Sequence, residues 1–184
     1  MCGATLDVFG NHALCCKHGS ARGVRHSEVN NRIKEALDRA GCISVLEPPG
    51  LIRQDGKRPD GATVLPFEDG LPIAWDATII HTCAPSYLRV STHEAGAAAA
   101  AAEERKRLKY ISLSGRVVFY PVALETLGAF GRSASELFDT IARRIEARSG
   151  ENGSRARLHR QIAAAVQLGN AACISEAHSR ASSR

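Results

Sequence analysis

Long apolar segments and export signals are missing from this sequence. The 184 residues contain no run of 18 apolar residues, which argues against a membrane-spanning helix and against a membrane partner. No signal peptide opens the chain, so we expect an intracellular protein, and a nuclear one if it acts on DNA. This length is enough for one domain with a substantial core and a tail.

Cysteines are too few and too unevenly spaced for a disulfide framework. Of the six, three fall within the first 16 residues, beside two histidines. We interpret this cluster as metal-binding, because Cys2, His12 and Cys16 have the spacing of a zinc knuckle, with Cys15 and His18 as alternative ligands. A closed zinc site takes four ligands, and a first cysteine is missing here. The alternative is a pair of buried thiols with surface histidines.

Acidic residues are outnumbered by basic ones, which gives a net charge of +5 and a pI of about 9.1. The excess is largest over residues 143–160, where six arginines and one histidine accompany only two glutamates. A basic balance favours polyanionic partners such as nucleic acid, although many mildly basic proteins bind none. Charge is therefore weak evidence by itself.

Apolar periodicity and turn residues predict alternating helices and strands. Ser27 is a candidate N-cap and Gly41 a candidate end for the first helix, and Ser133 with Glu136 forms a capping-box pattern. Pro121 indicates an edge strand or a bulge. We expect helices over 26–40, 92–110, 133–148 and around 155–168, and strands over 42–54, 60–66, 71–80 and 116–124.

The order of these elements predicts an α/β sandwich with a mixed central sheet. The same order is the minimal core of the restriction-endonuclease-like superfamily. We divide the chain into a Cys/His segment over 1–20, a core over 25–148, and a basic helix with a tail over 149–184. The Ser/Arg-rich end, 175–184, is expected to be disordered.

Two acids are candidate ligands for a divalent cation. Fifteen residues separate Asp60 from Asp76, enough for one strand, a turn and most of a second strand, so a hairpin could bring both carboxylates together. Mg²⁺ and Mn²⁺ prefer such oxygen ligands. The alternative is that Asp60 belongs to a Pro-Asp turn and Asp76 is a polar strand residue. Asp76 lies in an apolar strand, where an unpaired carboxylate is expensive.

The lysine that should accompany these acids is absent from its usual place. In the pattern PD-(D/E)xK the lysine follows the second acid by two residues, and that position is Thr78 here. Lys106 and Lys109 of the next helix could reach the same point, although both could equally belong to a solvated face. A lysine there would orient the attacking water and offset negative charge.

The start of the first helix carries further candidates. Arg25 and His26 could hold a phosphate. Glu28 or Glu35 could join the metal site, although an exposed helix face with Glu and Lys pairs is the better interpretation of Glu35.

These motifs together resemble one group: the C-terminal restriction-like endonuclease domain of site-specific non-LTR retrotransposons and their reverse-transcriptase-like relatives. In that group a Cys/His knuckle precedes a helix opening with Arg-His, a Glu-Pro strand end, a basic-Pro-Asp strand, an Asp-containing strand and a helix ending in Lys-Tyr. The matching segments are Cys2-Gly3, His12-Ala13-Leu14, Cys16, Arg25-His26, Glu47-Pro48, Arg58-Pro59-Asp60, Trp75-Asp76 and Glu104-Arg105-Lys106-Arg107-Leu108-Lys109-Tyr110.

The resemblance covers residues 2–148 and implies a role for each matching residue. Asp60 and Asp76 would bind Mg²⁺ or Mn²⁺, and Lys106 would be the displaced catalytic lysine. The substrate-binding residues would be Arg25, His26, Arg58, Lys109 and Tyr110.

The resemblance also implies an activity: nicking of a target DNA strand, whose 3′ end then primes reverse transcription, with element RNA as a further partner. The chain contains no polymerase region, and its knuckle is incomplete. We therefore expect a metal-dependent DNA endonuclease, with two alternatives. One is a catalytically inactive nucleic-acid-binding remnant of that domain, and the other is an interaction fragment with neither activity.

Overall fold

The computed structural model describes residues 7–52 and 56–182. Its centre is a four-stranded sheet of order β1-β2-β3-β4, in which β1 to β3 pair antiparallel and β4 lies parallel to β3. The strands are β1 (Ser44–Leu46), β2 (Gly61–Thr63), β3 (Ile73–Ile80) and β4 (Val118–Glu125). This confirms the expected α/β class and the mixed sheet. Pro121 lies in β4, at the edge of the sheet, where its missing N–H costs no ladder bond.

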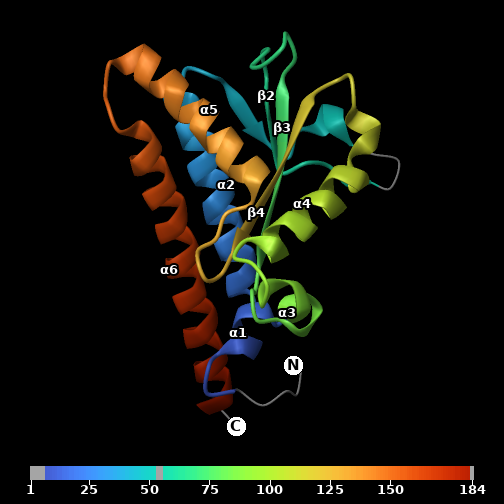
Figure 1. The fold of residues 1–184 in the computed structure, drawn as a ribbon, viewed down its shortest axis with the longest axis vertical. Coiled ribbons are helices and arrows are strands. Elements are labelled where there is room, and N and C mark those ends of the chain that lie inside the picture. The colour runs from blue at the N-terminus through green and yellow to red at the C-terminus, as the bar shows by residue number, and fades with distance from the viewer. Residues whose placement is uncertain (1–6, 53–55, 183–184) are drawn as a thin grey trace.

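One face of the sheet is covered by three helices, visible on the left of Figure 1. They are α2 (Ala21–Arg39), α5 (Arg132–Ser149) and α6 (Ser154–Ser182). Apolar residues of all three helices pack with Trp75, Ala77 and Ile79 of β3 into the main core. That core holds β3 in place, so the residues carried by β3 sit on a rigid support.

The opposite face is covered by α3 (Pro85–Ser91) and α4 (Ala97–Lys109), which form the crossover between β3 and β4. Ala98, Ala99 and Ala102 of α4 pack against Ile80 of β3. The small side chains of this alanine-rich segment let α4 approach the sheet closely. The alanine run is therefore a packing surface, and it places the lysines at the end of α4 over the middle of β3.

The remaining short elements are α1 (Asn11–Cys15) and the 3₁₀ turns η1 (Pro49–Leu51) and η2 (Ile111–Leu113). His81, just after β3, fastens α1 to the core: its Nδ1 lies 2.9 Å from Thr126 Oγ1 and its Nε2 lies 2.9 Å from Asn11 Oδ1.

Two helix starts differ from the expectation. Helix α2 begins at Ala21 rather than near Ser27, because the Glu176 carboxylate of α6 accepts hydrogen bonds from Ser20 N and Ala21 N. Helix α5 shows no side-chain cap from its own residues, and Glu103 of α4 accepts the N–H groups of Ser133 and Ala134 instead. Both caps come from distant segments, which local patterns do not reveal.

Two other segments also differ. The expected helix over 92–110 is helical only from Ala97, as α4, with Gly96 in the left-handed region (φ 86°) before it, and α3 is a separate helix that the sequence analysis did not predict. The Ser/Arg-rich end was expected to be disordered, but α6 continues to Ser182. Contacts across the molecule account for this continuation: Glu176 caps α2, and Arg180 Nη1 donates to His18 O at 2.8 Å.

Candidate active site

The candidate site lies at the start of β2, where the paired part of β3 ends and β3 continues alone on that side. In the β2–β3 register Gly61 is opposite Trp75, so the chain of β3 beyond Trp75 runs past the start of β2. Asp60 immediately precedes β2, which places it beside Asp76. The hairpin therefore brings together the two acids that the sequence analysis selected, and the charge of Asp60 affects the pKa of Asp76.

Asp60 and His26 bind the main chain of β3 at Ala77. Ala77 N donates to Asp60 Oδ2 at 2.6 Å, and His26 Nε2 lies 3.2 Å from Ala77 O. The same Nε2 lies 3.0 Å from Asp60 Oδ2. His26 is thus in direct contact with the first acid, a contact that the sequence analysis did not predict.

The backbone on the other side of Asp60 is held by Glu47. Glu47 N donates to Asp60 O at 2.8 Å, and Glu47 has φ 48°, a left-handed conformation that is unfavourable for a residue with a side chain. Glu47 also forms an ion pair with Arg58. The Glu47-Pro48 match therefore marks a strained turn that fixes Asp60, a role that sequence reasoning did not assign.

A second group that sequence reasoning missed is Asn30, which lies one helical turn after His26. Trp75 Nε1 donates to Asn30 Oδ1 at 2.9 Å, and Asn30 Nδ2 lies 3.4 Å from both ring nitrogens of His26. Asn30 and Trp75 are both buried. This chain of polar contacts orients the imidazole from within the core. The i, i+4 spacing of His26 and Asn30 was the available signal.

Asp76 is paired with two lysines of α4. Lys106 Nζ lies 2.5 Å from Asp76 Oδ2, and Lys109 Nζ lies 3.6 Å from the same atom. Asp76 is nearly inaccessible, with 5% of its side chain exposed, whereas Lys106 retains 23%. The structure therefore brings Lys106 to the second acid from the neighbouring helix, in place of a lysine at Thr78.

Tyr110 links the end of α4 to the strand that leads to Asp60. Its hydroxyl donates to Arg58 O at 2.8 Å and accepts from Lys109 Nζ at 2.8 Å. With Tyr110 1% exposed, the phenol fixes the chain at the Arg-Pro-Asp segment from inside the protein. Lys109 contacts both Asp76 and Tyr110 and, unlike Tyr110, is partly exposed to solvent.

Burial and neighbouring charges move three pKa values in the site. Burial raises the pKa of Asp76, and the charge of Asp60 adds to this, against the opposing effect of Lys106. Burial also acts to raise the pKa of Asp60, but the hydrogen bond and charge of His26 outweigh it and hold this pKa low. The hydrogen bond to Asp60 raises the pKa of His26. Asp60 is thus ionised. Its carboxylate and Ala77 O both lie within hydrogen-bond distance of His26 Nε2.

The other basic residue of the Arg-His pair has a different environment. Arg25 is 2% exposed, with Nη1 donating to Asn170 Oδ1 at 2.6 Å and Nη2 to Leu14 O at 3.1 Å. Its guanidinium therefore joins α2 to α6 and α1. Glu28 and Glu35 both pair with Arg32 on the surface of α2. These acids match the exposed-face alternative.

The oxygen atoms around Asp60 fit a hard divalent cation. The Asp60 carboxylate and Ala77 O both contact His26, Asp76 precedes Ala77 in β3, and Mg²⁺ or Mn²⁺ takes such oxygen ligands while keeping several waters. Across residues 7–52 and 56–182, no group of three or more His, Cys, Asp or Glu side chains is arranged to hold a metal ion. A cation would therefore rely on Asp60 and Asp76 together with main-chain, water and phosphate oxygens.

The predicted zinc site is only partly within view. Cys2 lies outside the described residues. His12 belongs to α1, and Cys16 is the first residue after that helix. Asp7 accepts hydrogen bonds from Asn11 N and His12 N and so holds the start of α1. Cys15, an alternative ligand, donates to Asn11 O at 3.2 Å. Zinc binding by Cys2, His12 and Cys16 stays a prediction.

Comparison with known proteins does not identify a family for this chain. The sequence matches no protein-family model and no curated protein. In the described part of the chain, no helix combines the length and apolarity that crossing a membrane requires.

Proposed function

We propose that this protein is a Mg²⁺- or Mn²⁺-dependent DNA endonuclease with a restriction-endonuclease-like core, related to the nuclease domain of site-specific non-LTR retrotransposons. One observation carries the proposal: Asp60 and Asp76 lie side by side at the end of a hairpin, and Lys106 contacts Asp76 from a neighbouring helix. Two acids and a lysine are the side chains that hydrolysis of a phosphodiester by this class requires.

The residues of the site have separable tasks in this proposal. Asp60 and Asp76 would hold the divalent ion, which when bound polarises the phosphate and activates a water molecule. Lys106 stabilises negative charge that develops on the phosphate, because its ammonium sits beside Asp76 and is partly exposed. Lys109, held by Tyr110, lies within reach of the same phosphate.

His26 has a positioning task. Its imidazole contacts Asp60 and Ala77 O and is oriented by Asn30, so it keeps the Asp60 carboxylate turned toward β3. Removing the ring would leave the Asp60 carboxylate held to β3 by the Ala77 N–H but without its contact to α2. We therefore expect loss of His26 to weaken metal binding rather than to remove a reacting group.

The direct test is nicking of supercoiled plasmid DNA with Mn²⁺ or Mg²⁺. Asp60→Asn keeps the shape of the side chain and an oxygen that accepts the Ala77 N–H, but removes the charge. We expect it to lower the nicking rate at least ~100-fold. Asp69→Asn is the matched control, because Asp69 is exposed in a turn with φ 49°, where asparagine is tolerated. Equal nicking by the wild type and Asp60→Asn would refute the catalytic proposal.

The second candidate is a catalytically inactive nucleic-acid-binding remnant. The observation that favours it is that both acids already have cationic partners: His26 contacts Asp60, and Lys106 contacts Asp76. Salt-dependent DNA binding that Mn²⁺ does not affect, with no nicking, would support this function. Whether the protein binds DNA, binds element RNA or acts in the nucleus depends on which of the two functions holds.

A further inference from the structure

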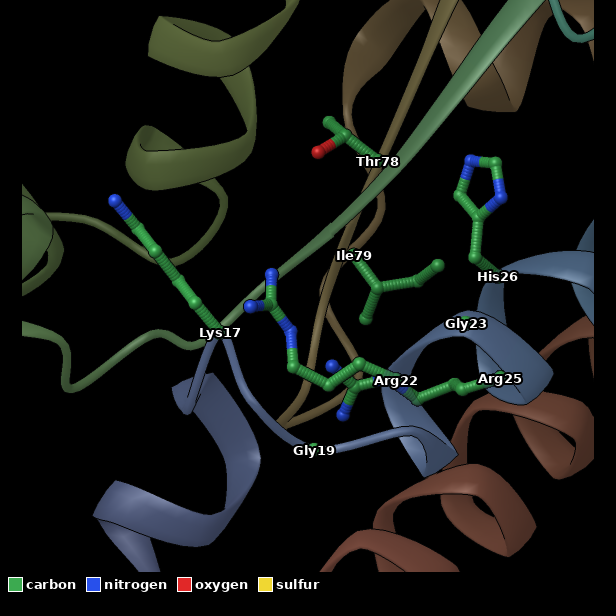
Figure 2. Close-up of a pocket in the computed structure, with 8 residues that line it drawn as sticks. All are labelled: Lys17, Gly19, Arg22, Gly23, Arg25, His26, Thr78 and Ile79. Carbon is green, nitrogen blue, oxygen red and sulfur yellow. The ribbon is translucent and has the colours of Figure 1, made fainter. Parts of the chain in front are cut away.

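A basic pocket opens next to the candidate active site, between the α1–α2 segment and β3 (Figure 2). Its volume is about 300 Å³, and four of the eight residues that line it are basic, whereas none is acidic. The basic residues are Lys17, Arg22, Arg25 and His26, and Thr78 and Ile79 of β3 form the opposite wall. Among these, His26 also contacts Asp60, so the pocket and the acids share a side chain.

Two of the arginines that line the pocket each have one buried nitrogen without a partner. Within the described residues, Nε of Arg22 and Nε of Arg25 are buried and have no hydrogen-bond acceptor. The Arg25 side chain is almost entirely buried, and its two terminal nitrogens are already engaged. Because solvent does not reach either Nε, an anion in the pocket would be held by the accessible parts of Lys17, Arg22 and His26 and not by these two atoms.

Arg22 is held in position for such an anion. Its Nη1 donates to Cys15 O at 3.2 Å, which fixes the guanidinium at the end of α1. Figure 2 shows Arg22 extending toward β3, whereas Lys17, at the rim of the pocket, points away from Thr78 and Ile79. Arginine and lysine at one pocket are typical of phosphate binding, since the guanidinium supplies directed donors and the ammonium supplies charge.

The positive end of α2 does not explain the pocket. The first N–H groups of this helix are taken by the Glu176 carboxylate, which accepts from Ser20 N at 3.1 Å and Ala21 N at 3.0 Å. The attraction for an anion therefore arises from the Lys17, Arg22 and His26 side chains. Substitution of single side chains can test it.

We propose that this pocket binds a phosphate of the DNA backbone next to the phosphate that is cut at Asp60 and Asp76. The proposal rests on the nuclease function above and adds a substrate contact to it. A strand with one phosphate at the acids would have a neighbouring phosphate within reach across His26, the residue common to both places. The contact would fix the register of the strand without reading its sequence.

The anion pocket is tested first with inorganic phosphate and the full-length protein, by NMR. We expect saturable shifts of the Gly19 and Gly23 amides and of the Arg22 Nε–H signal. Arg22→Gln should weaken phosphate binding at least ~5-fold, and Lys17→Gln, at an exposed position, should weaken it without any risk to folding. Arg132→Gln, which removes an exposed arginine of α5 outside the basic segment 143–160, is the control. Absence of saturable shifts would overturn the pocket, whatever the plasmid assay shows.

The DNA contact is tested by the salt dependence of DNA binding with Ca²⁺ in place of Mn²⁺. Arg22→Gln should lower the slope of log affinity against log salt by about 1, whereas Arg132→Gln should leave it unchanged. In the wild type, a neutral methylphosphonate next to the cut position should slow cleavage ~10-fold, and in Arg22→Gln it should slow cleavage less than ~2-fold. Equal slopes for the wild type and Arg22→Gln would contradict a phosphate contact. An equal methylphosphonate effect in both would contradict its place beside the cut.

Discussion

At the scale of single residues, charge converges on Asp76 and Asp60 from different sides. Lys106 and Lys109 approach Asp76 from α4, and His26 approaches Asp60 from α2. Asp76 is buried and Asp60 is partly buried, so their charges act strongly on any group that enters the site. The lysines compete with a cation for Asp76, but they also supply the positive charge that a phosphate needs.

Lys106→Met separates these two effects. The substitution preserves the apolar stem and removes the ammonium beside Asp76, so a divalent cation loses a competitor. We expect Mn²⁺ to bind as tightly as in the wild type or more tightly, while nicking falls about 100-fold. Calorimetry and plasmid nicking measure the two quantities. Lys34→Met, at a surface lysine of α2, should change neither. Unchanged nicking in Lys106→Met would remove the catalytic role of this lysine.

Gly61 is the residue whose small size the site needs most. A Cβ built on Gly61 would lie 2.1 Å from Cζ2 of Trp75, the buried strand residue opposite. Gly61→Ala should therefore lower the free energy of unfolding by about 2 kcal/mol through overpacking. The fluorescence of Trp75, the only tryptophan, reports unfolding in urea. Gly23→Ala, in α2 with no atom near its added Cβ, should instead raise stability by about 1 kcal/mol.

At the scale of elements, helix ends are secured by acids from other helices. Glu103 of α4 caps α5, and Glu176 of α6 caps α2. These long-range caps fix how the helices pack around β3. They also explain where sequence patterns failed, because a capping residue 30 or 155 positions away leaves no local signature. The apolar periodicity of α2 and α5, by contrast, was sufficient to predict both helices.

The Glu103 cap can be tested through stability. Glu103 is buried and accepts two N–H groups at the start of α5, so Glu103→Ala would leave both donors without an acceptor. We expect the free energy of unfolding to fall by about 3 kcal/mol. Urea denaturation measures it, and Glu104→Ala, at an exposed neighbour, should cost less than about 0.5 kcal/mol. Equal stability of the two variants would argue against the cap.

The Glu176 cap predicts a pH dependence. Hydrogen bonds from Ser20 Oγ and Ala21 N lower the pKa of Glu176 from its usual value of 4.5 to about 2. A depressed pKa in the folded state stabilises the protein fully above pH 4.5, and the stabilisation is lost as the pH falls toward 2. Wild type should therefore exceed Glu176→Gln in stability at pH 6 and lose that advantage near pH 2. A stability difference that does not depend on pH would contradict the assignment.

At the scale of the whole molecule, the fold places the edge of β3 that extends past the short strand β2 between two sources of positive charge. Helix α4 brings Lys106 over one face of β3, while the α1–α2 segment brings Arg22 and Lys17 to the pocket beside it. A phosphodiester strand lying along this edge would meet the acids and the basic pocket in turn. This arrangement is the physical basis for the two proposals.

Part of this arrangement could be predicted from the sequence. The spacing of Asp60 and Asp76 and the turn between them indicated a hairpin, and the motif order pointed to Lys106 as the missing lysine. The contributions of Asn30, Arg22 and Glu47 could not be predicted. Each depends on which segments meet in space or on a backbone conformation, and neither property is encoded in a short run of residues.

The most direct test of the central claim is anomalous diffraction from crystals of the protein soaked in Mn²⁺. We predict one Mn²⁺ ion held jointly by the carboxylates of Asp60 and Asp76, within reach of Lys106, and no ion there in crystals of Asp60→Asn. Anomalous signal only at other positions, or no signal between these two acids at saturating Mn²⁺, would contradict the metal-dependent nuclease.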